Sequence, residues 1–369
     1  MKKFFATLTA ALLLSTTGFA AQAEIILSAP NLSDNLSVMQ ALSQRKSSRN
    51  FVDKNLSVKQ LSKILWAANG INRPDGKRVN PAALGVHCVE VYAVTSEGIY
   101  LYDAPNHKLI LVANGDFRAL TTTGQSFVAK AAVNLVYVET PEVWSSARKI
   151  PPRDAQLSYA NISVGAMIQS VALAAQTEIS LPTVDKSGNL SVMQALSERK
   201  SSRNFVDKSL SVEQLGKILW AADGVNRPDG KRVNPAALGV HCVEVYAVTS
   251  EGIYLYDATN HKLTLIAEGD FRSATTTGQD FVTKAAVNLV YVEVPDAWSS
   301  ARRVPPREGQ LANANIVVGA MVQSVALAAQ TEGLGNCVRG SINRDEFKRV
   351  AKLSDAQTIL LAQSVGFVE

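Results

Sequence analysis

The pattern of apolar and polar residues predicts helices and strands in alternation along the chain. Residues 37–45 carry apolar side chains at helical spacing and predict a short helix. Ser57 and Gln60 form a capping box, in which each side chain bonds a backbone N–H of the other residue, so a second helix begins there. That helix is predicted to end at Asn69 and Gly70, because glycine is common just past a helix end.

A group of strands follows the second helix. Residues 89–93 alternate between apolar and polar side chains, and turns connect them to residues 99–102 and 108–112, which predicts antiparallel hairpins. Residues 134–138 are almost continuously apolar and predict a central strand. Residues 154–177 predict a long helix that is apolar on most sides and is therefore buried.

This whole pattern then occurs a second time. Residues 35–51 return as residues 189–205 with one change, at a fixed offset of 154 residues. The match continues to Glu178 in the first copy and to Glu332 in the second. A period of this length is the size of a domain and exceeds the repeats of solenoid proteins. The sequence therefore predicts two copies of one fold, which could pair as an internal dimer.

The two copies are unequal at their ends. After Glu332 the second copy continues to Glu369, with a predicted helix over residues 344–353 and a last strand over residues 358–365. After Glu178 the first copy simply restarts as the second. Functional parts in the additional segment are consequently present only once per chain.

The first 23 residues have the features of a secretory signal. Lys2 and Lys3 provide the basic start, residues 4–14 the apolar core, and residues 21–23 read Ala-Gln-Ala, which fits the cleavage rule. We therefore expect an exported protein, in the periplasm. The expected division is a signal peptide over 1–23, a first copy over 24–178 and a second copy over 179–369.

Composition narrows the class of protein. The net charge of +5 comes from scattered basic residues, which argues against a nucleic-acid partner. No stretch after the signal is apolar for long enough to predict a membrane span. An odd number of cysteines (Cys88, Cys242 and Cys337) does not suit a scaffold built on disulfides. A bridge between Cys88 and its repeat mate Cys242 is left open.

Three segments are candidates for chemistry. Residues 45–51 carry two arginines and two serines, which suit a phosphate, although an arginine-rich helix end is also common as a solvated surface. Residues 80–85 form a small-residue loop, where backbone can approach a flat ligand or simply turn. Residues 333–340 can be a helix cap followed by a strand, or part of a site.

The order of several motifs carries more weight than any one of them. The first motifs are Arg-x-Ser-x-Arg-x-Phe, Ile-Leu-Trp-Ala-Ala-x-Gly, Arg-x-x-Pro-Ala-Ala and Glu-Val-Tyr. Gly-Ile-Tyr-Leu-Tyr-Asp, Gly-Ala-x-x-Gln-Ser and Gly-Leu-Gly-x-x-x-Arg-Gly then follow. In this order they resemble the FMN-dependent nitroreductase superfamily, and within it the branch of azoline (thiazole/oxazole) dehydrogenases. The resemblance implies an α+β fold with a central, mostly antiparallel sheet flanked by helices. It also implies homodimers with flavins at the interface, so the tandem copies would form a pseudo-dimer.

The resemblance further implies which residues would bind FMN. Those expected to hold the phosphate and ribityl chain are Arg199, Ser201 and Arg203, with the first-copy mates Arg45, Ser47 and Arg49. Those expected against the flavin of the other copy are Pro81, Ala82 and Ala83, or Pro235, Ala236 and Ala237. Arg339 and Gly340 would lie near the edge of the flavin ring. No metal site is expected.

The sequence departs from the family pattern at two places that bear on the flavin. Gly85 and His87 stand where many relatives carry amide side chains. The first copy has no equivalent of residues 333–340, so we expect one competent site per chain, provided that the copies pair with each other. Pairing of second copies between two chains is the alternative.

These features together predict an exported FMN-dependent oxidoreductase that acts on a small molecule in a ping-pong cycle. No side chain is an evident general acid or base, so the catalytic residues stay unassigned. The alternative is a degenerate copy of the fold that binds a flavin or another small molecule without turnover.

Overall fold

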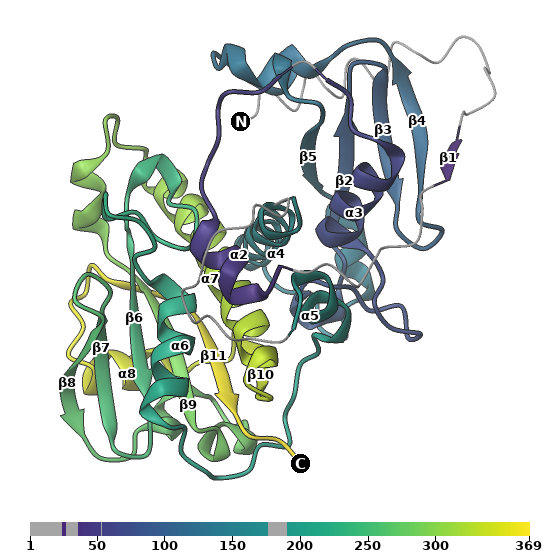
Figure 1. The fold of residues 1–369 in the computed structure, drawn as a ribbon. Coiled ribbons are helices and arrows are strands. Elements are labelled where there is room, and N and C mark those ends of the chain that lie inside the picture. The colour runs from purple at the N-terminus through teal and green to yellow at the C-terminus, as the bar shows by residue number, and fades with distance from the viewer. Residues whose placement is uncertain (1–23, 27–35, 53, 176–189) are drawn as a thin grey trace.

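The computed structural model describes residues 24–26, 36–52, 54–175 and 190–369, and these form two α+β units that lie against each other (Figure 1). The predicted signal and the junction over 179–189 lie outside the described residues. Each unit has an antiparallel sheet with helices packed on it, which confirms the predicted fold class and the tandem arrangement. The N-terminal unit is the first copy, and the C-terminal unit is the second.

The first copy contains a five-stranded sheet in the order β1-β4-β3-β2-β5. Its elements are β1 (Glu24–Ile26), α2 (Val38–Gln44), α3 (Val58–Asn69), η1 (Ala83–Gly85), β2 (Val89–Val94), β3 (Gly98–Asp103), β4 (Lys108–Asn114), η2 (Arg118–Thr121), η3 (Ser126–Lys130), β5 (Asn134–Glu139), η4 (Pro141–Ser146) and α4 (Arg153–Ala174).

The second copy contains a six-stranded sheet in the order β10-β11-β9-β6-β7-β8. Its elements are α5 (Val192–Glu198), α6 (Val212–Asp223), η5 (Ala237–Gly239), β6 (Val243–Val248), β7 (Gly252–Asp257), β8 (Lys262–Glu268), η6 (Arg272–Thr275), η7 (Asp280–Lys284), β9 (Val287–Glu293), η8 (Pro295–Ser300), α7 (Arg307–Thr331), β10 (Gly335–Arg339), α8 (Arg344–Val350) and β11 (Thr358–Gly366).

One strand prediction is wrong for the first copy and right for the second. Residues 134–138 were expected to form a central strand, but in the described part of the chain β5 lies at the edge of its sheet and pairs with β2 alone. Its repeat mate β9 is central, between β6 and β11. The difference arises because β11 belongs to the segment that follows only the second copy.

The predicted helix starts are confirmed at both capping boxes. Ser57 and Gln60 bond each other's backbone N–H groups, as do Ser211 and Gln214. Gly70 ends α3 as predicted, but its φ of −69° is not left-handed. Glycine is needed here for a different reason, because a Cβ atom would lie 2.3 Å from the Trp66 ring.

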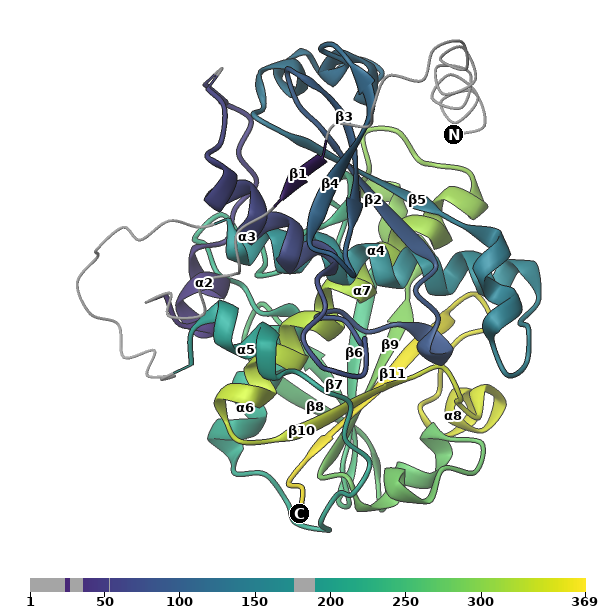
Figure 2. The ribbon, with the colours of Figure 1, turned by 90° about the vertical axis from the view of Figure 1, so that its right-hand side faces the viewer.

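The two copies meet at the crossing of α4 and α7, which lie between the two sheets (Figure 2). At the crossing a Cβ atom on Gly165 would lie 2.0 Å from the carbonyl oxygen of Ile316. Its mate Gly319 is equally close, with 2.1 Å to the carbonyl oxygen of Ile162. Only glycine lets the two backbones approach this closely, so the pair of glycines fixes where the helices cross.

The two crossing helices are also long and apolar enough to span a membrane, by length and composition alone. Of the 18-residue stretch that is apolar enough to span, 78% is buried inside the protein in α7 and 56% in α4. A helix that is apolar on all sides also suits the core of a soluble domain. The absence of a membrane span stays a prediction.

The three cysteines are free and buried. Cys88 and Cys242 immediately precede β2 and β6, and they are not bridged.

Gly165→Ala tests the close approach of the copies. The added methyl group overlaps the backbone of α7, so we expect the free energy of unfolding to fall by about 3 kcal/mol, measured by urea denaturation. The matched control is Gly216→Ala within α6, where the nearest atom to a Cβ is 3.4 Å away. The control should be neutral or slightly stabilising, because alanine favours helix over glycine. Equal stability of the two variants would contradict the crossing.

Candidate functional site

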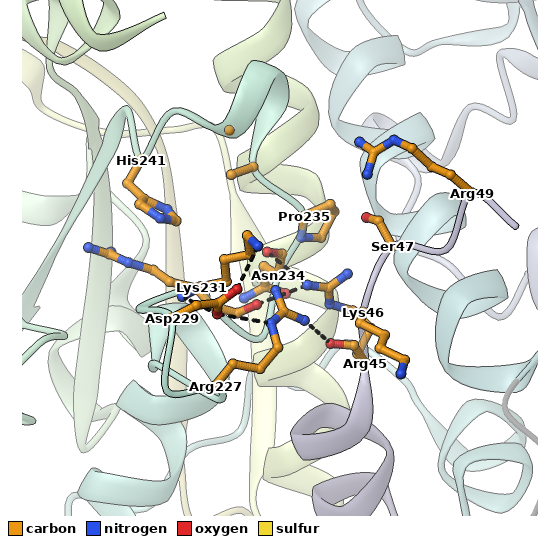
Figure 3. Close-up of a pocket in the computed structure, with 13 residues that line it drawn as sticks. Arg45, Lys46, Ser47, Arg49, Arg227, Asp229, Lys231, Asn234, Pro235 and His241 are labelled. Carbon is orange, nitrogen blue, oxygen red and sulfur yellow. Dashed lines mark hydrogen bonds and ion pairs between the residues drawn. The ribbon is translucent and has the colours of Figure 1, made fainter. Parts of the chain in front are cut away.

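Two pockets lie between the copies and are related by the repeat. The Arg199 pocket, named for its buried arginine, joins residues 199–203 of the second copy to residues 73–87 of the first and encloses about 400 Å³. The Arg45 pocket joins residues 45–49 of the first copy to residues 227–241 of the second and encloses about 350 Å³. Figure 3 shows the Arg45 pocket, with Ser47 and Arg49 on one side and His241 on the other. Both volumes fall in the range typical of small-molecule sites.

Each pocket is strongly cationic. The Arg199 pocket has one carboxylate, Asp75, against six basic side chains: Arg73, Lys77, Arg78, Arg199, Lys200 and Arg203. Asp75 is paired with Lys77 and lies 3.6 Å from Arg73. The Arg45 pocket repeats this composition, with Asp229 as its single acid. A site of this charge favours an anionic ligand.

The structure brings together most of the residues that the sequence singled out. In the Arg199 pocket these are Arg199, Ser201, Arg203, Pro81 and Ala82. In the Arg45 pocket they are Arg45, Ser47, Arg49, Pro235 and Ala236. Ala83, Ala237, Arg339 and Gly340 do not line these pockets. Ala83 and Ala237 instead begin the short helices η1 and η5 and pack at the edges of the hydrophobic cores.

The two buried arginines are engaged with backbone. Arg199 is 3% exposed, and its Nε and Nη2 atoms donate to the carbonyls of Val79 (2.7 Å) and Arg78 (3.1 Å) in the other copy. Arg45 donates in the same way to Val233 and, over 2.9 Å, to Arg232. Burial and, to a smaller extent, the charge of a neighbouring arginine lower the pKa of both guanidinium groups to about 10. Each arginine therefore holds the opposite pocket wall in place.

The opposite walls return these contacts. Arg73 donates to the carbonyl of Arg199 over 2.7 Å, and Asn72 donates to the carbonyl of Leu196 over 2.9 Å. The carbonyls at the C-terminal end of α5 have no partner within the helix, and these side chains satisfy them from the other copy. Asn226 and Arg227 repeat the arrangement at the end of α2. These contacts could not be predicted from the sequence, because the partners lie more than 100 residues apart.

A buried polar network connects both pockets to the helix crossing. Asn80, which lines the Arg199 pocket, accepts from the Ser170 hydroxyl (2.7 Å), and Ser170 accepts from Gln323 of α7 (2.9 Å). Asn234 repeats this chain through Ser324 and Gln169. The pocket walls are thus attached to the interface helices by hydrogen bonds that run in both directions across the pseudo-twofold axis.

The two pockets differ in how well their arginine-bearing wall is held. In the second copy, the N–H of Ser202 donates to Asn336 of β10 (2.7 Å), and the N–H of Val206 donates to Phe367 (2.9 Å). Phe205 is only 4% exposed there, whereas its mate Phe51 is 40% exposed. Residues 46–50 of the first copy are all exposed. The Arg199 pocket therefore has a preformed wall that the Arg45 pocket lacks.

Arg339 lies inside the second sheet. Its guanidinium donates to Ser364 (2.9 Å), to the carbonyl of Thr275 (2.7 Å) and to Asn288 (3.1 Å). Gly340 faces Tyr159 of α4, with 3.4 Å from a would-be Cβ atom to the ring. The side chain of Arg339 supports the sheet, while Gly340 contacts the first copy.

Two residues in or next to the small-residue loop have unusual properties, His87 in its pKa and Leu84 in its backbone conformation. Burial, and then the charges of Arg78 and Arg73, lower the pKa of His87 to about 4, so this imidazole is neutral near pH 7. Leu84 has a positive φ of 55° and is 61% exposed, and its mate Leu238 has the same φ and is 62% exposed. A leucine in the left-handed region is strained, and such residues are concentrated at functional sites. Sequence reasoning did not single out Leu84.

The family of the chain follows from its sequence matches. Residues 42–178 and 196–367 each match the Nitroreductase family. The chain belongs to the nitroreductase family. Both copies are family members, which confirms the resemblance and the duplication.

Several known proteins are similar to this nitroreductase-family chain. A protein named "Putative nitroreductase" from Methanocaldococcus jannaschii is 25% identical over 193 residues, covering 50% of this chain and 94% of the relative. A solved structure of a nitroreductase-type protein from Ralstonia eutropha is 33% identical, covering 52% of this chain and 89% of its own, with a TM-score of 0.47. One from Anabaena variabilis is 14% identical but covers 88% of this chain and 93% of its own, with a TM-score of 0.67, so the fold extends over both copies.

Arg199→Met tests whether this arginine supports the pocket wall. The variant leaves the carbonyls of Val79 and Arg78 without a donor, and we expect a loss of about 2–4 kcal/mol in the free energy of unfolding of flavin-free protein. The control Arg203→Met removes an exposed guanidinium in the same segment and should cost less than about 0.5 kcal/mol. Equal losses would show that the carbonyl contacts of Arg199 do not stabilise the fold.

Proposed function

We propose that this protein is an FMN-dependent oxidoreductase that acts on a small molecule, with the flavin held in the Arg199 pocket. Membership of the nitroreductase family supports the reaction class. The observation that carries the proposal is the meeting of Ser201 and Arg203 of one copy with Pro81 and Ala82 of the other in a single cationic pocket.

The residues present fit FMN. The excess of basic side chains matches a phosphate, which arginine binds with charge-assisted hydrogen bonds. Pro81, Ala82 and Gly85 leave room for a flat ring, and nothing lies within 4 Å of a would-be Cβ atom on Gly85. Because the Arg199 guanidinium is engaged with carbonyls, Ser201, Arg203 and Lys200 are the groups of this segment that would bind the phosphate.

FMN, when bound, would supply two-electron chemistry, used alternately by two substrates in a ping-pong cycle. The chain's own residues bind, orient and exclude water. The neutral imidazole of His87 can donate one hydrogen bond without adding charge to the pocket. Arg73 and Lys77 at the rim favour an anionic substrate.

One pocket per chain would be competent. The C-terminal segment of the second copy holds residues 201–206 by backbone hydrogen bonds, and the first copy has no such segment. A preformed wall reduces the ordering cost of binding, so the Arg199 pocket should bind the flavin more tightly than the Arg45 pocket.

Export is part of the proposal. A basic start, an apolar core and an Ala-Gln-Ala site support a signal peptide over residues 1–23 and a periplasmic location. Nicotinamide cofactors are scarce outside the cytoplasm, so the electron donor or acceptor would be another small molecule.

A second candidate is a binding protein without turnover. The observation in its favour is that both pockets keep six basic side chains against a single carboxylate, which suits an anionic ligand in each of them. In this reading the duplicated fold keeps its pockets for capture of an anionic molecule.

Flavin stoichiometry tests the proposal. The mature protein, saturated with FMN and then denatured, should release one equivalent per chain. Arg203→Ala should weaken FMN binding at least tenfold, since a hydrogen bond to a charged group is lost. The repeat mate Arg49→Ala is the matched control and should leave the tight site unchanged. Two equivalents per chain, or a larger effect of Arg49→Ala, would contradict the single site.

Turnover separates the enzyme from the binding protein. Photoreduced flavin on the protein should be reoxidised rapidly by a quinone or a nitroaromatic compound in stopped-flow absorbance. If the bound flavin reoxidises no faster than free FMN, the binding protein is the better account.

A further inference from the structure

The edge strand of the first sheet has the sequence of a strand that is paired on both sides elsewhere in the chain. Residues 133–139 and 287–293 both read Val-Asn-Leu-Val-Tyr-Val-Glu. In the second copy β9 pairs with β6 and β11, and all of its residues are buried. In the first copy β5 pairs with β2 alone among the residues that the structure describes, and all of its residues are half-exposed. The same seven residues thus stand in a completed and in an uncompleted sheet.

The hydrogen-bonding groups that seat the C-terminal segment are retained in the first copy. In the second copy the Tyr291 hydroxyl donates to Gln363 of β11 over 2.9 Å. Asn288 accepts from Ser364 over 2.6 Å and from Arg339 over 3.1 Å. The first-copy equivalents are Tyr137 and Asn134. Within the described part of the chain, neither the Tyr137 hydroxyl nor the Asn134 carbonyl oxygen has such a partner.

The apolar residues that contact that segment in the second copy have retained equivalents in the first. Phe347 of α8 packs edge-on against Tyr246 at 6.1 Å between ring centroids, and the first copy has Tyr92 at the same position. Phe205 is buried against Cys337 and Val368, whereas Phe51 is 40% exposed. Among the residues that the structure describes, nothing covers the edge and one face of the first sheet as the C-terminal segment covers the second.

The edge of β5 also lacks the usual protection. Exposed edge strands in native proteins carry lysine, proline or a bulge that prevents pairing with another chain. The central residues 135–138 are Leu, Val, Tyr and Val, and the pairing of β5 with β2 is regular. In the second copy β10 lies between β11 and residues 201–206. The equivalent first-copy residues 45–51 are separated from β5 in Figure 1.

We propose that the first copy is an acceptor for a pair of β-strands donated by another polypeptide. One donated strand pairs with β5 as β11 pairs with β9, and the other pairs with the first donated strand as β10 pairs with β11. The donor is recognised by the chemistry of residues 335–366: a glutamine placed for Tyr137, a serine and an arginine placed for Asn134, and an apolar helix for the open face. Main-chain pairing gives such an interaction its affinity, and the side chains give its specificity.

The chain's own C-terminal segment does not meet this need. Each chain has one segment and two acceptor sheets, so transfer of the segment to a β5 edge leaves a β9 edge open. Exchange between chains therefore forms no additional strand pairs. A separate polypeptide that carries such a segment forms them without loss.

A synthetic peptide of residues 333–369 tests the acceptor on the full mature chain. We expect calorimetric binding at one equivalent per chain and slower hydrogen exchange at residues 134–139. Val136→Lys introduces a charge on the half-exposed strand and should weaken binding at least tenfold. Val212→Lys, at a position in α6 that is 89% exposed, is the control and should bind as the parent chain does.

Tyr137→Phe guards against a variant that fails to fold, because it removes only the hydroxyl group. It should weaken peptide binding about threefold to tenfold, the range of one hydrogen bond. Absence of binding would overturn the proposal and leave the retained residues as a trace of recent duplication. Loss of exchange protection in the chain's own β11 would also overturn it, since the peptide would then occupy the second sheet. Self-association that protects β5 without peptide uptake would assign the edge to a second copy instead.

Discussion

The close crossing of α4 and α7 is the contact on which the rest of the molecule depends. Gly165 and Gly319 bring the two backbones together where any side chain would overlap a carbonyl group. From this crossing, hydrogen bonds through Ser170 and Ser324 reach Asn80 and Asn234 in the pocket walls. The pockets are therefore consequences of the pairing, since each takes one wall from each copy.

The two copies contribute equivalent residues to their interface, but only the second copy has a completed sheet. Both copies keep the buried arginine, the asparagine and arginine that satisfy the opposite helix end, and the small-residue loop. Only the second copy has the segment from β10 to β11, which completes its sheet and holds residues 201–206. The segment that only the second copy has thus accounts for two differences in the first copy: a more exposed pocket wall and an open strand edge among the described residues.

The features that could be predicted from the sequence are those set by neighbouring residues. The capping boxes at Ser57 and Ser211 depend on a side chain three residues away, and both are confirmed. The place of β5 in its sheet depends on a strand that the first copy does not have, so its local pattern was misleading. The fold class was predicted from the order of the motifs, because that order resembles a known family. Local periodicity predicted single helices and strands but not their arrangement.

The candidate site shows the same limit. Residue type pointed to Arg45 and Arg199, but their carbonyl partners lie 120 to 189 residues away, so their structural role was not visible. A mid-helix glycine at Gly165, repeated at Gly319, was the available sign of a close helix contact, since glycine weakens a helix without a packing reason. The family resemblance implied that residues 199–203 meet the small-residue loop of the other copy. Only the folded chain shows that they share one pocket with residues 73–87.

Each pocket takes both of its walls from one chain. Lys77 and Lys200 line one pocket, and Lys46 and Lys231 line the other. Protein labelled with nitrogen-15 would be mixed with unlabelled protein and treated with a lysine cross-linker, and the linked peptides identified by mass spectrometry. The account predicts that the 77–200 and 46–231 links join only peptides of the same isotopic label. Links between labelled and unlabelled peptides at these positions would show that the copies pair between chains and would contradict it.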